Sequence, residues 1–179
     1  MELKVEKKVE VDMELKKNKK KMRKKKIKKK IYNPDIKYNS KLVTYFINHI
    51  MKNGKKYLAY KIFYTTLNII KKKFENKKKL PLEILKESIK NISPDVEVKS
   101  KKIGGTTYNI PVHVNEKKKK YLSIKWLIYF SKKRKGKNMS EKLANEIISA
   151  YRGIGETIKK KNELHKIAES NKAFSHFKF

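Results

Sequence analysis

The apolar residues of this chain follow a helical spacing on both sides of one short stretch in which they alternate with polar residues. Residues 96–114 show that alternation around Gly104-Gly105, which predicts a two-stranded hairpin. The helical spacing predicts six helices, at about 40–54, 55–74, 81–93, 119–134, 138–152 and 157–174. The expected fold is therefore mainly α: a six-helix domain with a protruding two-stranded antiparallel β-ribbon between the third and fourth helices.

The apolar stripes of these helices are interpreted as core. In the second helix the expected stripe consists of Leu58, Ile62, Ile69 and Ile70. The fourth helix is apolar nearly all round from Ser123 to Phe130, so we expect it to be the most buried. Ser40 and Asn138 stand where they can cap the first and fifth helices.

Two registers are open to the hairpin. A two-residue turn at Gly104-Gly105 pairs Val98 with Pro111 and places the two apolar sets on opposite faces. A three-residue loop that includes Thr106 pairs Val98 with Val112 and gives one apolar face, and this is the register we expect. The valines at the base can rest on the helices, while nothing apolar is expected to hold down the tip, which offers Lys99, Lys101, Lys102 and two glycines. The ribbon is therefore predicted to reach into a partner.

The net charge of the chain limits the kinds of partner that it can have. Its 179 residues carry a formal net charge of +33, and residues 16–30 alone hold 12 Lys or Arg. Such a charge on a small body repels itself, which predicts a polyanionic partner. Residues 1–31 are interpreted as a flexible basic N-terminal arm, with a tail of no binding importance as the alternative, and 32–179 as the folded domain.

The chain lacks the residues that several other classes of function require. The chain has no cysteine, which excludes disulfides and Cys-ligated metals. Gly104-Gly105 fits no nucleotide-binding motif, and no nucleophile–base pair stands out. His165 and Glu169 share a helix face but lack a further nearby ligand, so no metal and no cofactor are expected. No apolar run approaches the roughly 20 residues of a membrane span. The sequence does not predict an enzyme.

Nucleic-acid binding has positive support. Lysines, which neutralise phosphates, gather at the ends of the predicted elements, and aromatic residues lie among them. Because no DNA-reading motif is present, recognition of folded RNA by shape is favoured. The alternatives are a basic architectural DNA-binding protein and a basic module on a membrane surface.

Longer stretches resemble the bacterial-type family of small-subunit ribosomal protein seven. The matching segments run in the same order from about residue 32 to residue 179: Asn33-Pro-Asp, Gly54-Lys-Lys, the hairpin from Pro94 to Val112, Ser123-Ile-Lys-Trp-Leu, Lys133-Arg-Lys-Gly-Lys-Asn-Met-Ser, Lys142-Leu-Ala-Asn-Glu, and the ending from His165 to Phe177. The resemblance implies a primary rRNA-binding protein that nucleates assembly of the head (3′ major) domain. It also implies a position near the exit-site tRNA, with small-subunit proteins nine and eleven as neighbours.

The resemblance further implies which residues hold RNA. Carried onto this sequence, the rRNA-binding residues are Lys24, Lys25, Lys26, Lys28, Lys37, Lys55, Lys56, Lys99, Lys101, Lys102, Lys125, Trp126, Lys132, Lys133, Arg134 and Lys137. Those near tRNA are Gly104, Gly105 and Lys172. No membrane, small-molecule substrate or metal is implied. Lysine stands at several positions where the family often has arginine, which keeps the charge but loses the planar fork of donors.

The same comparison indicates a source. The amino-acid sequence after Phe130 and that at the C-terminus are most similar to the sequences of plastid and cyanobacterial relatives. Of the 50 basic residues 47 are lysine, a residue with A/T-rich codons. We therefore expect an organellar ribosome, of a plastid or apicoplast, with a mitochondrion or a low-GC bacterium as alternatives.

Overall fold

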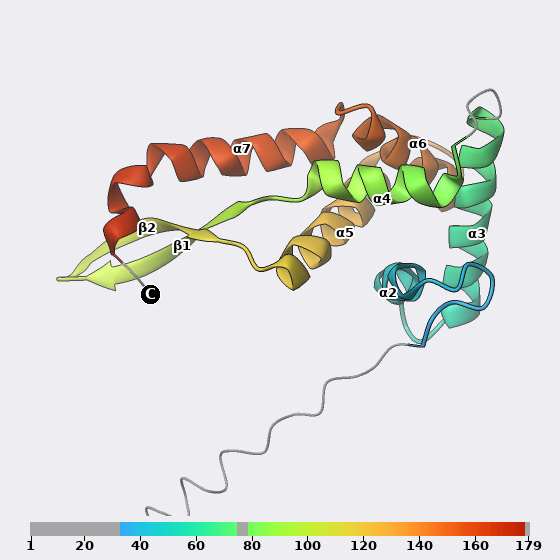
Figure 1. Cartoon of the computed structure of the whole chain (residues 1–179), viewed down its shortest axis with the longest axis horizontal. Helices are drawn as coiled ribbons and strands as arrows, with labels where there is room; N and C mark the ends of the chain where they lie inside the picture. The colour runs from blue at the N-terminus through green and yellow to red at the C-terminus, as the bar shows by residue number, and fades with distance from the viewer. Residues whose placement is uncertain (1–32, 75–78, 178–179) are drawn as a thin grey trace, which may run out of the picture. The chain divides into compact units, whose positions relative to one another are not determined.

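The computed structural model describes residues 33–74 and 79–177, so the predictions for the arm at 1–31 lie outside the described residues. Within these ranges the chain forms six α-helices and one β-ribbon (Figure 1). The elements are α2 (Lys41–Ile50), α3 (Lys56–Lys73), α4 (Pro81–Ile92), β1 (Val96–Ile103), β2 (Thr106–His113), α5 (Glu116–Lys133), α6 (Met139–Tyr151), α7 (Glu156–Ser170) and the short 3-10 helix η1 (Lys172–His176). The predicted fold class is confirmed, with the ribbon between the third and fourth helices.

The helical body packs around α6, which contacts α3, α4 and α5. Seven of its 13 residues are buried, among them Leu143, Ala144 and Ile147. The expectation that α5 is the most buried helix is therefore wrong. Only one side of α5 enters the core, through residues such as Ile124 and Leu127. Its other side faces outward, because a lysine and a tyrosine interrupt the apolar run there.

The buried face of α3 also differs from the expected stripe. Ala59, Phe63, Leu67 and Ile70 form the buried face, whereas Leu58 is 51% exposed. Leu58, Ile62 and Ile69 each precede a buried residue and lie about 100° from it around the helix. They occupy the margin of the face, and of the expected stripe Ile70 alone is fully in the core.

The helix starts follow the predicted positions more closely than the predicted contacts. Ser40 and Asn138 stand at the N-caps of α2 and α6, but neither side chain makes a capping hydrogen bond. The side chain of Asn115 does cap α5, because its Oδ1 accepts from the backbone N–H of Lys117 at 3.4 Å. Helix α5 therefore begins at Glu116, three residues before its predicted start at 119.

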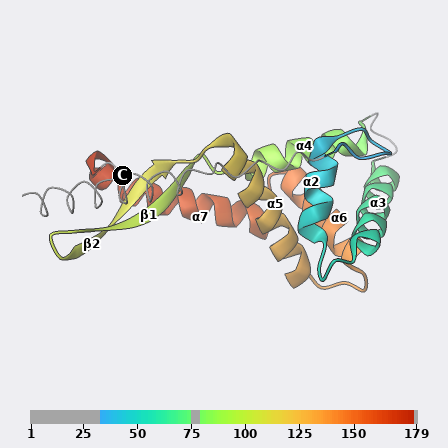
Figure 2. The same ribbon diagram turned by 90° about the horizontal axis from the view of Figure 1, so that it is seen from below.

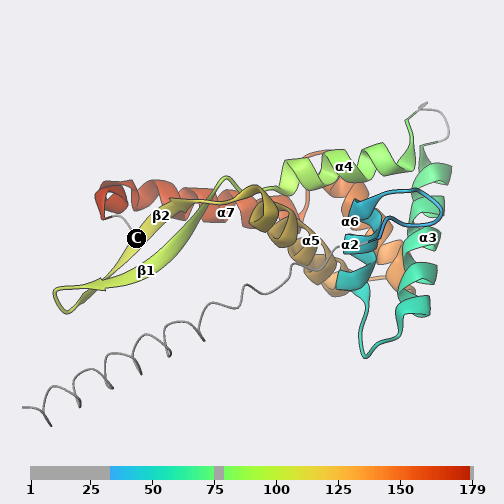
Figure 3. The ribbon, with the colours of Figure 1, turned by 60° about the horizontal axis from the view of Figure 1, so that its bottom comes forward.

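The ribbon and α7 run side by side away from the helical body, as Figures 2 and 3 show from two directions. The strands are joined by the two-residue turn, which pairs Val98 with Pro111 and Ile103 with Thr106. The expected three-residue loop is wrong. Gly104 and Gly105 have φ values of 56° and 88°, and this pair of positive angles is what a tight two-residue hairpin turn needs.

The C-terminal segment explains why two apolar faces are tolerated. The ring of Tyr108 packs 5.2 Å from that of Phe174 and 5.4 Å from that of Phe177. Pro111, on the opposite face, shares a cavity wall with Ala168 of α7. Each apolar set thus has its own neighbours, and these come from the C-terminal part of the chain rather than from the ribbon itself.

Candidate nucleic-acid interface

The outward side of α5 carries a stripe of aromatic and lysine side chains, which we call the α5 face: Tyr121, Lys125, Tyr129, Lys132 and Lys133. Tyr121 is 38% and Tyr129 51% exposed. The Nζ of Lys125 lies 5.5 Å from the centroid of the Tyr121 ring, and the Nζ of Lys133 lies 4.6 Å from that of Tyr129. Residues three and four apart share one side of a helix, so the sequence spacing itself builds the stripe.

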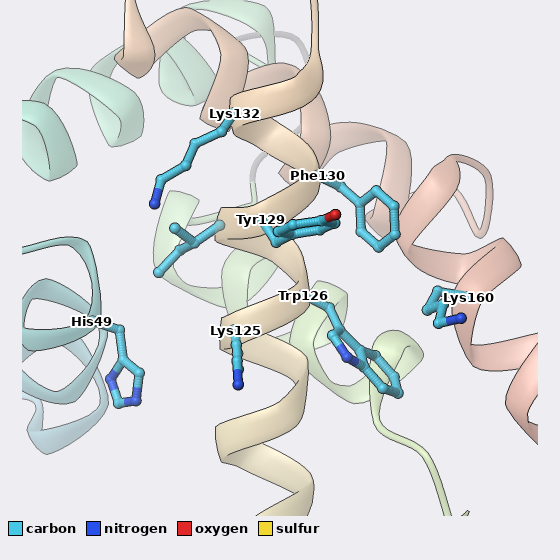
Figure 4. Close-up of a pocket in the computed structure, with 8 residues that line it drawn as sticks. His49, Lys125, Trp126, Tyr129, Phe130, Lys132 and Lys160 are labelled. Atoms are coloured by element: carbon cyan, nitrogen blue, oxygen red, sulfur yellow. The ribbon is translucent and has the colours of Figure 1, made fainter.

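A cavity of about 420 Å³ opens beside this face, and we call it the aromatic cavity. It is lined by His49 of α2, Lys160 of α7 and, from α5, Lys125, Trp126, Ile128, Tyr129, Phe130 and Lys132. In Figure 4 the side chains of Trp126 and Phe130 project from α5 toward the helix that bears Lys160. Its wall is mostly apolar, its charged lining residues are lysines, and the lining contains no carboxylate.

A second cavity, of about 390 Å³, lies between the α2–α3 loop and α5, and we call it the lysine cavity. Lys52, Lys55 and Lys132 line it over an apolar floor, again with no carboxylate in the lining. Burial, followed by the positive charge of Lys52, lowers the pKa of Lys132. A bound anion would reduce the repulsion between two ammonium groups held this close together.

The ribbon carries its lysines in a different setting. Near its base, Glu97 accepts a hydrogen bond from the Nζ of Lys118 at 2.6 Å and lies 3.7 Å from the Nζ of Lys99. The Nζ of Lys119 lies 2.7 Å from Asp95, and this bond holds the pKa of that carboxyl below its usual value. Toward the tip, Lys101 pairs with Tyr108 and Lys102 with Thr107, so the two lysines point to opposite faces.

Arg134, at the end of α5, is engaged inside the protein. Its Nε donates to the carboxylate of Glu146, and its Nη2 donates to Ser149 at 2.7 Å. Glu146 is 1% exposed and also accepts a hydrogen bond from the hydroxyl of Thr157. The guanidinium thus joins α5 to α6, and through Glu146 to the start of α7.

Lys37 lies in a turn that its sequence neighbour builds. The carboxylate of Asp35 accepts hydrogen bonds from the backbone N–H groups of Lys37 and Tyr38, at 3.2 and 3.1 Å. It also accepts one from the hydroxyl of Tyr64 at 2.8 Å, and burial, then this bond, raises the pKa of Tyr64. The ammonium of Lys37 lies 5.3 Å from the Tyr64 ring centroid.

The remaining predicted residues are spread over the fold. Lys55 and Lys56 lie at the start of α3, and Lys137 lies in the loop before α6. Gly104 and Gly105 form the ribbon's turn, whereas Lys172 lines a cavity at the ribbon's base with Pro111, away from that turn. Lys24, Lys25, Lys26 and Lys28 lie outside the described residues.

Histidine chemistry does not add a metal centre among residues 33–74 and 79–177, where no group of three or more potential ligands is found. The Nε2 of His165 accepts a hydrogen bond from the backbone N–H of Asp95 at 3.2 Å, so the residue ties α7 to the ribbon's base. In the same part of the chain, no helix combines the length and apolar character needed to cross a bilayer.

Sequence reasoning missed four residues that the structure brings to the two cavities: His49, Lys52, Tyr129 and Phe130. It counted Lys160 among the lysines at the ends of elements but did not place it beside Trp126. Tyr129 could have been found, since it lies four residues after Lys125 and four before Lys133. Lys52 precedes the Asn53-Gly54 turn, which was treated as a helix end. Lys160 comes from a helix distant in sequence, and no local signal connects it to Trp126.

Comparison with known proteins shows what the sequence is similar to. The sequence model of the family described as Ribosomal protein S7p/S5e matches residues 22–172. The chain is 46% identical over 146 residues to the small ribosomal subunit protein uS7 of Porphyromonas gingivalis, which covers 82% of this chain and 92% of that protein. Its identity to the proteins of the same description from Christiangramia forsetii and Natranaerobius thermophilus is 46% and 44%, with the same shares covered.

Proposed function

Since the chain belongs to the ribosomal protein S7p/S5e family, we propose that it is a primary rRNA-binding protein that nucleates assembly of the head (3′ major) domain. Membership of this family means a structural role in the small ribosomal subunit and in translation. The family is one of structural ribosomal proteins rather than of enzymes. The finer role concerns what the protein touches within that subunit.

The observation that carries the proposal is the absence of carboxylates from the lining of the aromatic and lysine cavities. Lysines elsewhere in the protein, such as Lys118 and Lys119, have acidic partners within 2.7 Å. The linings of the two cavities hold no carboxylate, and of their lysines in the described part of the chain Lys160 is paired with an acid outside the lining, Glu163 at 3.3 Å. A phosphate is therefore the counter-charge that suits the others, Lys52, Lys55, Lys125 and Lys132. Exposed aromatic rings beside them favour RNA with unpaired bases.

The ribbon supports the second part of the proposal, contact with the exit-site tRNA at the subunit interface. Its tip, with Gly104 and Gly105, is exposed and extends beyond the helical body (Figure 1). Proteins nine and eleven of the small subunit are the proposed protein neighbours. An organellar source, plastid or apicoplast, stays a prediction, because the relatives from Porphyromonas gingivalis and Christiangramia forsetii are bacterial.

A competition experiment tests the RNA-binding function. The full-length chain is bound to a labelled transcript of the small-subunit head domain at physiological salt. Unlabelled transcript and duplex DNA, matched in phosphate concentration, then compete. We expect the transcript to displace the label far better than the DNA, because the cavities suit an irregular single-stranded backbone.

Equal or better displacement by duplex DNA would instead support the architectural DNA-binding alternative. Sedimentation provides an independent readout, since a subunit constituent co-migrates with small subunits. Substitution of Lys71 and Lys72 by alanine is a matched control, because both lie at the end of α3 opposite Lys55. That variant should leave the discrimination between transcript and DNA unchanged.

A further inference from the structure

Trp126 differs from the other large aromatic residues around it. Its indole is half-buried, and within residues 33–74 and 79–177 no ring packs against it and no cation lies over it. Tyr129, by comparison, already has the edge of Phe130 at 5.2 Å and the ammonium of Lys133 over its ring. A half-exposed indole without a ring neighbour has a face available for stacking.

The surroundings of that indole define what would stack there. Trp126 and Phe130 lie on the same side of α5, and Lys160 stands across from them on α7 (Figure 4). Lys125 and Lys132 complete the charged lining. The volume of about 420 Å³ falls within the roughly 300–1,000 Å³ typical of sites for small planar or drug-sized ligands.

We propose that the aromatic cavity receives one unpaired nucleobase of RNA, which stacks on Trp126 while Lys125 and Lys160 contact its flanking phosphates. The proposal rests on the RNA-binding function above and names the ligand of one site within it. The combination of an apolar wall with three cations and no carboxylate is complementary to a nucleotide, which has an apolar face and an anionic backbone. It does not suit a carboxylate-rich peptide, which would bury no planar group, or an uncharged apolar segment, which would give Lys125 and Lys132 no counter-charge.

The chain supplies its own reporter for this contact, because Trp126 is its only tryptophan. Stacking of a base on an indole quenches its fluorescence and shields it from a neutral quencher such as acrylamide. We expect both effects when the full-length protein is titrated with the head-domain transcript. The measurement uses the unaltered chain, so it does not depend on whether a variant folds.

Substitutions separate stacking from charge. Trp126→Leu should weaken binding of the transcript about tenfold, with no change in the dependence of affinity on salt. Trp126→Phe keeps an aromatic face and should restore most of that loss. Lys125→Ala should instead reduce the salt dependence by about one phosphate contact, and thermal melting checks that each variant is folded.

The outcomes distinguish this proposal from the function on which it rests. If the transcript binds tightly but tryptophan emission and acrylamide quenching do not change, the base-stacking site is wrong while RNA binding stands. The same conclusion follows if Trp126→Leu folds and binds like the unaltered chain. If the transcript does not bind at all, the proposed function fails first.

Discussion

The α5 face and the base of the ribbon both carry closely spaced lysines, yet they differ in where the counter-charges lie. At the ribbon's base, Glu97 and Asp95 pair with Lys118 and Lys119 within 2.7 Å. The cavities beside the α5 face have no carboxylate in their lining. The lysines therefore tie the ribbon's base to α5, whereas those of the cavities, apart from Lys160 with its partner Glu163, need an external anion.

The difference matters for binding energy. A lysine that gives up a carboxylate to meet a phosphate gains little, and the carboxylate left behind repels the phosphate. A lysine in a carboxylate-free cavity gains the full effect of releasing the counterions of the RNA. Net charge alone does not predict which lysines bind, because it counts both kinds equally.

Arg134 gives the largest expected effect and tests the comparison from the α5 side. Its guanidinium pairs with Glu146, which is 1% exposed, so Arg134→Ala leaves a buried carboxylate without its partner. We expect a loss of about 3 kcal/mol in the free energy of unfolding, measured by urea denaturation. Arg134→Lys should lose less. A stable Arg134→Ala variant with reduced salt dependence of RNA binding would make Arg134 an RNA ligand instead.

The next prediction compares lysine pairs directly. Lys52→Ala with Lys132→Ala removes two cations from the lysine cavity and should lower the salt dependence of RNA affinity by about two phosphate contacts. Lys99→Ala with Lys118→Ala removes two cations that lie near Glu97 and should lower it by less than one. Filter binding of the head-domain transcript at several salt concentrations measures both. Equal losses would contradict the role given to the carboxylates.

The tip of the ribbon forms a third case, between these two. Lys101→Ala with Lys102→Ala should reduce the salt dependence by about two contacts if both faces of the ribbon reach RNA. Because the two lysines point to opposite faces, the single variants should add. No change in either would remove the ribbon from the RNA-binding surface and leave the α5 side as the whole of it.

The sequence predicted the parts of the fold that depend on local pattern. Six helices and a ribbon at 96–114 follow from spacing, and the observed elements agree. The predicted register of the ribbon was wrong because of a tertiary contact. Phe174 and Phe177 cover Tyr108, so the ribbon did not need a single apolar face. The prediction that α5 is the most buried helix was wrong, because periodicity shows that a helix has an apolar side but not which helix is central.

Charge and family resemblance predicted several residues of the candidate site, but the sequence did not predict which of them lie together or form ion pairs. Lys125, Trp126 and Lys132 were expected to bind, and they line a common cavity. The positions of Lys52 and Lys160 beside α5 were missed, because they are set by how loops and α7 pack against that helix. Arg134 was expected to bind RNA, and its ion pair with a buried glutamate twelve residues later could not be recognised from sequence spacing.

The smallest predicted effect is a pH dependence that only the α5 side should show. Burial and the charge of Lys52 lower the pKa of Lys132, whereas a bound phosphate favours the charged ammonium and raises it again. Binding therefore takes up a proton at pH values between the two, and RNA affinity falls as pH rises through that interval toward the ordinary lysine value of about 10.4.

Two substitutions isolate the contribution of Lys132. Lys132→Arg keeps a charge that does not titrate in this range, so its affinity should fall less with pH than that of the unaltered chain. Lys52→Ala removes the second cause of the lowered pKa and should move the onset to higher pH. Titration of the RNA bases is common to all variants and cancels in the ratio of affinities. A pH profile that stays the same in Lys132→Arg would show that the crowded ammonium pair is not where the RNA phosphate binds, and the contrast with the ribbon would then rest on salt dependence alone.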